Sequence, residues 1–480
     1  MQPTAHAFKQ NAHAALGDTK LQRALGFFQL GQAGLAERRR QAVSRLPEFE
    51  ALREQGKAIK NHTLAHLDFY LERFEKNCIA AGGHVHWARN AEEARAIVLD
   101  ICRKLGARTV TKGKSMIGEE IAINDHLAAN GIEPIETDLG EYIVQIRDEM
   151  PSHIIAPAIH LTKDEVAHSF RETHTHLDPA RALEEPRALL DEARTILRQK
   201  FLDADVGITG ANFLIAETGS SVIVTNEGNG DLTQLLPKAH IVLASLEKVV
   251  PTLEDASAIL RLLARSATGQ DMSVYTTFST GPRRPGDPDG PGEYHVVLLD
   301  NGRSALLGTE MEEVLRCIRC GACMNNCPVY GSIGGHAYGW VYPGPIGSVL
   351  TPSLVGVAEA HHLPNASTFC GRCESVCPMK IPLPKLMRHY REREFEQKIS
   401  PPTQRAALAL WAFFAKRPSL YHSLSRVAAS FLGRLGRRHG GFHNLPLAGG
   451  WTAGREMPAP QGKTFQAMWQ ERQKAKGGRA

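Results

Sequence analysis

Two short cysteine runs, about forty residues apart, constrain this chain more than any other feature. The first, RCIRCGACMNNCPVY, spaces four cysteines by two, two and three residues and follows the last one with proline. The second, STFCGRCESVCPMK, repeats the last three of these positions and the proline. The seven cysteines are Cys317, Cys320, Cys323, Cys327, Cys370, Cys373 and Cys377. This spacing is typical of proteins that hold two iron–sulfur clusters.

In proteins with two such clusters, the last cysteine of each run ligates the cluster that the other run mainly holds. We therefore expect a first cluster on Cys317, Cys320, Cys323 and Cys377, and a second on Cys327, Cys370 and Cys373. The proline after each crossing cysteine keeps that cysteine extended, which turns the chain away from the cluster. Zinc ribbons also contain C-x2-C pairs but rarely this four-cysteine spacing, so iron–sulfur clusters are the stronger prediction.

The second cluster is one ligand short on this count. Aligning the two runs on their Cys-Pro ends places Ser367 where a fourth cysteine would stand. A serine oxygen is a harder and rarer iron ligand than a thiolate. Three outcomes stay open: a three-iron cluster, a four-iron cluster with Ser367, water or another residue on the odd iron, or a labile site that binds substrate.

Length and composition indicate a globular protein with several domains. The 480 residues are 42% hydrophobic and 22% charged, which is ordinary for a folded protein. We expect an N-terminal helical region at 1–75, an α/β domain at 76–305 and an iron–sulfur module at 306–395. A basic helical region with a flexible tail would occupy 396–480.

The α/β domain is predicted from an alternation of short apolar runs and amphipathic segments, such as HVHWA before AEEARAIVLDICRKLG. This alternation indicates a doubly wound, mostly parallel sheet. We include HIIAPAI at 153–159 among its strands. We also expect one helix that begins at Ser115 and is closed by Gly131.

Positive charge gathers at the C-terminal end. From Lys385 onward there are 18 Lys and Arg residues against 5 Asp and Glu, whereas the whole chain carries +5. Such a region can bind nucleic acid, anionic lipid or an acidic partner, or be a solvated tail, and no nucleic-acid-binding motif is present. The N-terminus lacks a signal peptide, and no apolar run is long enough to span a bilayer. Because clustered free thiols also favour the cytosol, we expect a cytoplasmic protein without a transmembrane segment.

Two softer candidate sites lie in the α/β domain. The segment TKGKS at 111–115 leads from a strand into a helix, where an anion can bind, but it lacks the full phosphate-loop spacing. A plain capped turn is therefore favoured there. Glu217 and the segment NEGNG at 226–230 lie at strand ends, where open α/β sheets bind their ligands. Glu217 is a candidate pocket carboxylate, with a solvated turn carboxylate as the alternative.

With the cysteine runs placed after this α/β domain, the chain resembles the lactate-utilisation protein B family. The segments that carry the resemblance are KGKSM at 112–116, AETGS at 216–220, NEGNG at 226–230, CIRCGACMNNCPVY at 317–330, GWVYPGPIGSVLTP at 339–352 and CGRCESVCPMKIPL at 370–383. The resemblance implies an α/β domain of the LUD type, shared with sugar-phosphate isomerases and coenzyme A transferases. It also implies two [4Fe-4S] clusters on the seven cysteines and an electron-carrying role while lactate is oxidised to pyruvate.

The partners that the resemblance implies are a second iron–sulfur subunit and a LUD-domain subunit, with a flavin- or quinone-linked acceptor and membrane association only through partners. We predict an electron-transfer subunit in which Arg316, Arg319 and Arg372, beside the ligands, raise the cluster potentials. The alternative is a stand-alone hydroxy-acid enzyme that uses the incompletely ligated cluster as a Lewis acid, or the α/β pocket with Glu217. An assembly scaffold that docks partners through its basic tail is a third candidate.

Overall fold

The computed structural model describes residues 4–29, 34–113, 115–444, 449–452 and 454–477. The chain divides into two compact units, residues 1–394 and residues 395–480. The first unit opens with helices, as predicted. They are α1 (Phe8–Gly17), α2 (Thr19–Gln29), α3 (Leu35–Ser44), α4 (Phe49–Ala65) and α5 (Leu67–Ala80).

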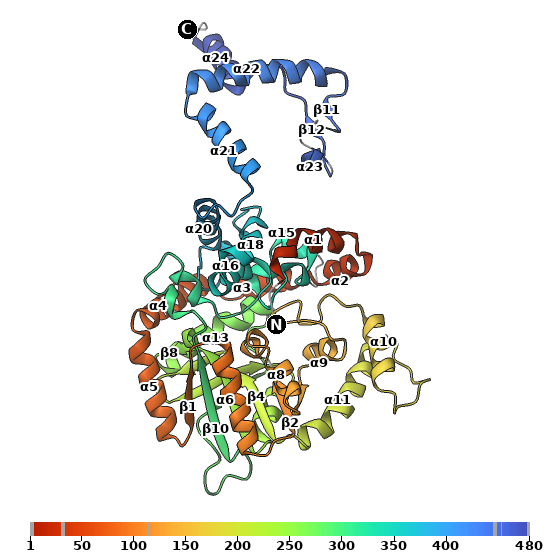
Figure 1. The fold of residues 1–480 in the computed structure, drawn as a ribbon, viewed down its shortest axis with the longest axis vertical. Helices are drawn as coiled ribbons and strands as arrows, with labels where there is room; N and C mark the ends of the chain where they lie inside the picture. Colours follow the sequence, from red (N-terminus) through yellow and green to blue (C-terminus); the bar gives the residue numbers. More distant parts are fainter. Residues whose placement is uncertain (1–3, 30–33, 114, 445–448, 453, 478–480) are drawn as a thin grey trace. The chain divides into compact units, whose positions relative to one another are not determined.

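A six-stranded sheet forms the centre of the first unit (Figure 1). Its strand order is β1-β10-β7-β4-β2-β3, and every neighbouring pair is parallel. The strands are β1 (His84–Ala88), β10 (Glu293–Leu299), β7 (Ala239–Ser245), β4 (Val206–Gly210), β2 (Thr109–Gly113) and β3 (Glu133–Glu136). The predicted parallel sheet is therefore confirmed.

Helices cover both faces of this sheet, as the side chains of β7 show. Ile241 and Leu243 pack into a core with α6, whereas Val242 and Ala244 point to the other face and pack against α5. Successive strand residues face opposite sides, so a strand buried along its whole length needs an apolar partner on each side. The helices of this domain are α6 (Ala91–Lys104), α7 (Met116–Glu120), α8 (Ile123–Ala129), α9 (Leu139–Ile146), α10 (Lys163–Thr173), α11 (Pro186–Leu202), α12 (Asn229–Leu235) and α13 (Leu253–Ala267).

A second, smaller sheet follows the carboxyl ends of β4 and β7. Its order is β8-β5-β6-β9, with β6 antiparallel to both of its neighbours. The strands are β5 (Phe213–Ile215), β6 (Ser220–Thr225), β8 (Val249–Val250) and β9 (Tyr275–Ser279). The apolar pattern predicts these strands but does not separate them from the main sheet. The separate sheet matters because it brings Thr225 and Asn226 to the pocket described below.

Two local predictions are wrong. Residues 153–159 form turns rather than a strand: Pro157 has no N–H to offer a sheet ladder, and the His153 ring accepts a hydrogen bond from the Ile155 N–H at 3.1 Å. The helix expected from Ser115 to Gly131 is broken into α7 and α8, because Ala122 adopts a left-handed conformation with φ of 50°.

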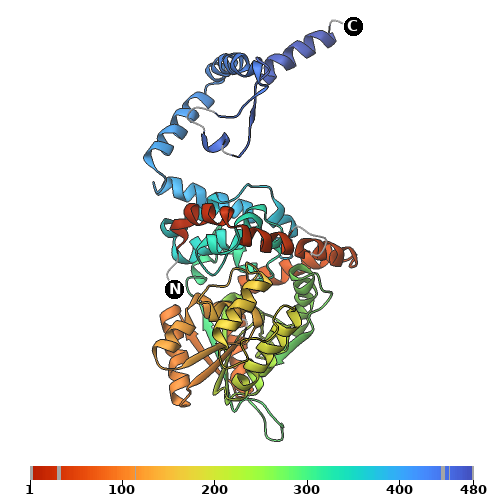
Figure 2. The ribbon, with the colours of Figure 1, turned by 90° about the vertical axis from the view of Figure 1, so that its right-hand side faces the viewer.

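Short helices form the module that carries both cysteine runs. They are α14 (Ala322–Asn325), α15 (Pro328–Ile333), α16 (Gly344–Val355), α17 (Val357–Ala360), α18 (His362–Asn365), α19 (Arg372–Val376) and α20 (Leu383–Glu396). The N-terminal helices pack against this module, and the Phe8 ring meets the Tyr338 ring edge-on with centroids 5.6 Å apart. Figure 2 shows the red N-terminal helices lying across the cyan module.

The second unit is helical. Its main helices, α21 (Pro402–Ala415) and α22 (Pro418–Leu435), are separated just before Pro418, and neither contains a buried residue. The last forty residues are not extended throughout, since α24 (Phe465–Gly477) forms there, after the short elements β11 (Gly441–Phe442), α23 (Gly449–Thr452) and β12 (Met457–Pro458). Within the described residues, no helix combines the length and apolar character that a membrane crossing requires.

Candidate functional site: two cysteine cavities and an adjoining pocket

The first cysteine cavity is small and apolar. Its volume is about 20 Å³, and its lining includes Ile154, Ile346 and Met379. The cysteines that line it are Cys317, Cys320, Cys323 and Cys377. No three of the described His, Cys, Asp and Glu side chains converge closely enough to hold a single metal ion; these cysteines surround a space instead. The fold thus brings the four residues predicted for the first cluster around one cavity.

The second cysteine cavity has a different lining. Its cysteines are Cys327, Cys370 and Cys373, and Ser367 and Thr368 are among the polar residues of its wall. Cys370 is exposed to solvent, whereas Cys373 is buried. The fold therefore groups the three cysteines predicted for the second cluster, with the serine that aligns with the absent cysteine beside them. The assignment of individual ligands stays a prediction.

The two cysteine loops share an unusual backbone conformation. Arg319 and Phe369, each just before a cysteine, have φ of 58° and 54°. Gly321 and Gly371, each just after that cysteine, have φ of 73° and 78° and precede the short helices α14 and α19. Non-glycine residues rarely occupy the left-handed region, and such strain gathers at functional sites.

The shared backbone places Ser367 where the first loop has Cys317. The Arg319 N–H donates a hydrogen bond to Cys317 Sγ at 3.4 Å, and the Phe369 N–H donates one to Ser367 Oγ at 3.1 Å. The serine hydroxyl thus takes the same hydrogen bond from the same loop position as the thiol sulfur. The alignment made on the sequence alone is matched by this local geometry.

The environment of the thiols fits iron–sulfur clusters. Burial raises the pKa of Cys320 and of Cys373 to about 12, so without iron these thiols hold their protons. Cluster assembly would release those protons, because iron binds the thiolate. Main-chain N–H groups donate to the sulfurs, as the Ile381 N–H does to Cys377 Sγ at 3.5 Å, and such bonds tune cluster potentials. Sulfur donors grouped around a small cavity are the surroundings that such clusters require.

Several arginines lie near the cysteine loops, and the three named from the sequence differ in burial. Arg316 is buried and donates to Asn61 and to the Lys380 carbonyl, and Arg319 is buried as well, whereas Arg372 is exposed. Sequence reasoning missed Arg39 and Arg53. They donate to the main-chain carbonyls of Val376 and Cys377, at 2.8 Å and 2.7 Å, from helices more than 300 residues earlier in the chain.

A buried ion network joins the first cysteine loop to the α/β domain. Glu247, which follows β7, pairs with Arg303 at 3.1 Å and with Arg319 at 3.2 Å. Burial acts to raise the pKa of Glu247, but these two guanidinium groups lower it to about 2, so the carboxylate is ionised. Arg303 also pairs with Glu120 at 2.6 Å. Arg319 therefore links a cysteine loop to the strand-end region of the sheet.

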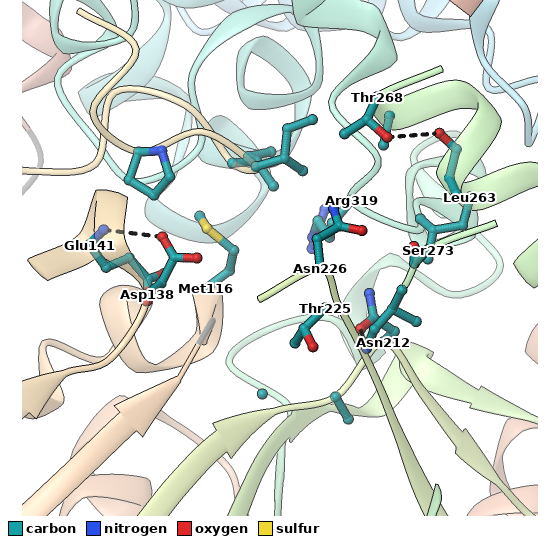
Figure 3. A pocket seen from close by; sticks show the side chains of 18 of the residues that line it. Met116, Asp138, Glu141, Asn212, Thr225, Asn226, Leu263, Thr268, Ser273 and Arg319 are labelled. Carbon is teal, nitrogen blue, oxygen red and sulfur yellow. Dashed lines mark hydrogen bonds between the residues drawn. The ribbon is translucent and has the colours of Figure 1, made fainter. Parts of the chain in front are cut away.

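A larger pocket lies at this junction (Figure 3). Its volume is about 150 Å³, and it is lined from the main sheet by Gly210 and Leu243 and from the cysteine module by Arg319 and Tyr342. The small sheet contributes Thr225, and Asn226 follows directly. This is the strand-end position at which open α/β sheets bind ligands.

Of the other candidate residues named from the sequence, some line this pocket and some do not. Asn226, from the NEGNG segment, lines it. Glu217 does not; its side chain is exposed and accepts a hydrogen bond from the Leu253 N–H at 3.1 Å, which matches the solvated alternative. In the segment at 111–115, Lys112 is buried in ion pairs with Glu119 and Glu136, and Ser115 caps α7, so the capped turn is confirmed. Lys114 lies outside the described residues.

Comparison with known proteins agrees with this layout. Residues 71–299 match the LUD domain family, residues 313–381 the 4Fe-4S dicluster domain family, and residues 388–474 the family described as lactate utilisation protein B, C-terminal. The dicluster match and the two cysteine groups identify two [4Fe-4S] clusters as the cofactors.

Whole-chain relatives give the same result. The chain is 43% identical to lactate utilization protein B of Bacillus licheniformis over 93% of both chains. It is 42% identical to the proteins of that name from Bacillus pumilus, over 98% of both chains, and from Bacillus subtilis, over 92% of both. A DUF162 family crystal structure from Deinococcus radiodurans, with a TM-score of 0.25 and 18% identity, covers 48% of this chain and 98% of its own, a likeness too remote to bear on function. The chain belongs to the lactate utilisation protein B family.

Proposed function

We propose that this chain is the iron–sulfur electron-transfer subunit of an L-lactate oxidation system, in which electrons pass through its two [4Fe-4S] clusters. The observation that carries the proposal is the pair of cysteine-lined cavities in one compact module. The name of the relatives supports the pathway, because proteins 42–43% identical over nearly the whole chain are called lactate utilization protein B.

The ligand sets follow the two cavities. We assign the first cluster to Cys317, Cys320, Cys323 and Cys377. We assign the second to Cys327, Cys370 and Cys373. The Ser367 hydroxyl, which occupies the loop position that Cys317 has in the first run, is the proposed fourth ligand. The regional boundaries near residues 75, 305 and 395 belong to the same proposal.

The residues around the two clusters differ in solvent exposure, so we expect the clusters to play different roles in electron transfer. Cys370 and Arg372 are exposed, so the second cluster would exchange electrons with a partner at the surface. Cys320 and Cys377 are buried, and the first cluster would be shielded from water between the module and the α/β domain. Buried Arg319 would favour the reduced, more negative state of the first cluster and so raise its potential. A second iron–sulfur subunit and a LUD-domain subunit are the proposed partners, with a flavin- or quinone-linked acceptor.

Anaerobic reconstitution with iron and sulfide tests this proposal. The protein should bind about eight irons and eight sulfides, as two cubane clusters require, and dithionite should bleach its visible absorption. The reduced protein should pass electrons to the partner subunits but should not oxidise L-lactate alone. Zinc content with no colour after reconstitution would refute the cluster proposal, whereas L-lactate turnover by the isolated chain would favour the stand-alone enzyme.

A further inference from the structure

The pocket at the carboxyl edge of the sheet contains a buried cation that has no partner. Lys248 lines the pocket and is 7% exposed. Among the described residues, its ammonium group makes no hydrogen bond and no ion pair within 4.0 Å, although Glu247, Arg319, Cys317 and Lys60 lie near enough to influence it. A buried ammonium group without a partner is costly, and proteins rarely keep one without a use.

A second donor at the same wall is also unsatisfied. Arg319 lines the pocket; its Nη2 reaches Glu247 and its guanidinium stacks on the Tyr342 ring at 4.7 Å. Its buried Nη1 has no hydrogen-bond partner within the described part of the chain. The wall therefore offers the Lys248 ammonium group as a donor to a carboxylate and places the positive charge of Arg319 beside it.

Buried ion pairs continue from this wall into the α/β domain. The buried cations nearby are Lys60, Lys248, Arg303 and Arg319, the carboxylates paired among them are Glu120 and Glu247, and two further buried carboxylates, Asp138 and Glu141, line the pocket itself. Lys60 is satisfied by the main-chain carbonyls of Glu247 and Val249. Lys248 and Arg319 are the cations of this network that line the pocket, and of these two only Arg319 is paired with Glu247.

The rest of the lining limits what the anion can be. Met116, Ile155 and Leu263 supply apolar walls that suit a short alkyl group. Asp138 and Glu141 stand on the other side of the pocket from Arg319 in Figure 3, and Asn212 and Thr225 add polar contacts. The volume of about 150 Å³ is well below the roughly 300–1,000 Å³ of pockets for drug-sized ligands. A molecule of only a few heavy atoms fits these limits.

We propose that this pocket binds a short monocarboxylate, with the carboxylate on Lys248 and Arg319 and the remainder of the molecule against the apolar wall. The proposal deepens the proposed function and rests on it only for the choice of probe. Because Arg319 also lines the first cysteine cavity, whereas Lys248 does not, an anion bound here would lie next to the first cluster and not the second.

A simpler reading is that the cations only balance the negative charge of a thiolate-bound cluster. Lys248 lies near enough to Cys317 for their charges to interact, but it lines the pocket and not the cysteine cavity. The two readings differ in the laboratory. Charge balance alone predicts a change in cluster potential in Lys248→Met with no ligand bound by either protein.

The experiment is anaerobic calorimetry on the reconstituted full chain with L-lactate and pyruvate as probes, and with lactamide as the uncharged analogue. Both acids should bind and lactamide should not. Lys248→Met should weaken binding about 30-fold or more, as removal of one member of a buried charge pair does, and Lys248→Arg should restore part of it. Lys238→Met, at an exposed lysine paired with Asp205, is the matched control and should bind like the unaltered protein.

Electron paramagnetic resonance on the reduced protein gives a second reading. Saturating L-lactate or pyruvate should shift the signal of the first cluster and leave that of the second unchanged, and Lys248→Met should abolish the shift. Absence of binding by the unaltered protein, unchanged affinity in Lys248→Met, or inorganic phosphate binding as tightly as the two acids would overturn the proposal. Binding is measured apart from electron transfer, so a failed relay with an intact Lys248-dependent site would refute the proposed function alone.

Discussion

The two cysteine loops have the same backbone turn but different surroundings. In both loops a left-handed residue precedes a cysteine and a left-handed glycine follows it, and the N–H of that first residue bonds the side chain two positions earlier. The first loop is buried against the α/β domain and presents a thiol at that position, whereas the second lies nearer solvent and presents a hydroxyl. Backbone geometry thus fixes the side-chain positions in both loops, and we expect the different surroundings to set how firmly and at what potential each cluster is held.

The largest effect should come from removing a buried sulfur of the first loop. Cys320→Ser leaves the first cavity with three thiolates in an apolar space, so we expect loss of that cluster and about half of the bound iron. Iron and sulfide analysis after anaerobic reconstitution measures this. Cys102→Ala, at a buried cysteine outside both cavities, should keep full iron content. Full iron content in Cys320→Ser would remove the distinction between the loops.

Replacing Ser367 should change the ligand of only one iron, the iron of the second cluster that has no cysteine ligand. Ser367→Cys supplies the thiolate that the first loop already has, and we expect a second cluster that resists loss of iron and resembles the first spectroscopically. Ser367→Ala should lose about one iron and show a three-iron signal, because the oxygen donor is gone. Ser375→Cys, on the exposed side of the same loop, should change neither property. Mössbauer spectra of Ser367→Ala identical to the unaltered protein would rule out the hydroxyl as a ligand.

The two clusters should lose their iron at different rates when a chelator is added. Cys370 is exposed and the first-loop cysteines are buried or half-buried, so bathophenanthroline or slow oxidation should remove the second cluster several-fold faster than the first. The decay of the two reduced-cluster signals over time gives both rates in one sample. Equal rates, or faster loss of the first cluster, would show that exposure in this structure does not govern access.

The smallest effect should be a shift in potential. Arg319→Met removes a buried positive charge beside the first cluster, which should lower the potential of that cluster by on the order of 50–100 mV from the Coulomb energy at an effective dielectric constant of about 20. Arg372→Met, at an exposed position of the second loop, should change its cluster far less, because water screens the charge. Redox titration followed by paramagnetic resonance distinguishes the two. Similar shifts in both variants would contradict the difference in burial.

The local sequence pattern predicts much of the fold. The features that it does not predict depend on contacts between residues that are far apart in the sequence. Strand and helix alternation was sufficient for the parallel sheet, and the cysteine spacing was sufficient for the two groups of thiols. The segment at 153–159 has an apolar composition but is held by side-chain contacts such as that of His153 with Asn325, at 2.9 Å. Lys248 belongs to no sequence motif; it is marked only by its burial and by the lack of a hydrogen bond or ion pair to any residue that the structure describes. Asn226, named from the sequence, lines the pocket, whereas Glu217 is exposed outside it.

The contacts of Arg39 and Arg53 with Val376 and Cys377 have a consequence for biosynthesis. The arginines leave the ribosome early, but the carbonyl groups they bind are made more than 300 residues later. The nascent chain therefore cannot form these hydrogen bonds until translation is nearly over. Until then its N-terminal helices lack these tertiary contacts. The N-terminal helices can therefore close over the second cysteine segment only after both cysteine runs have left the ribosome.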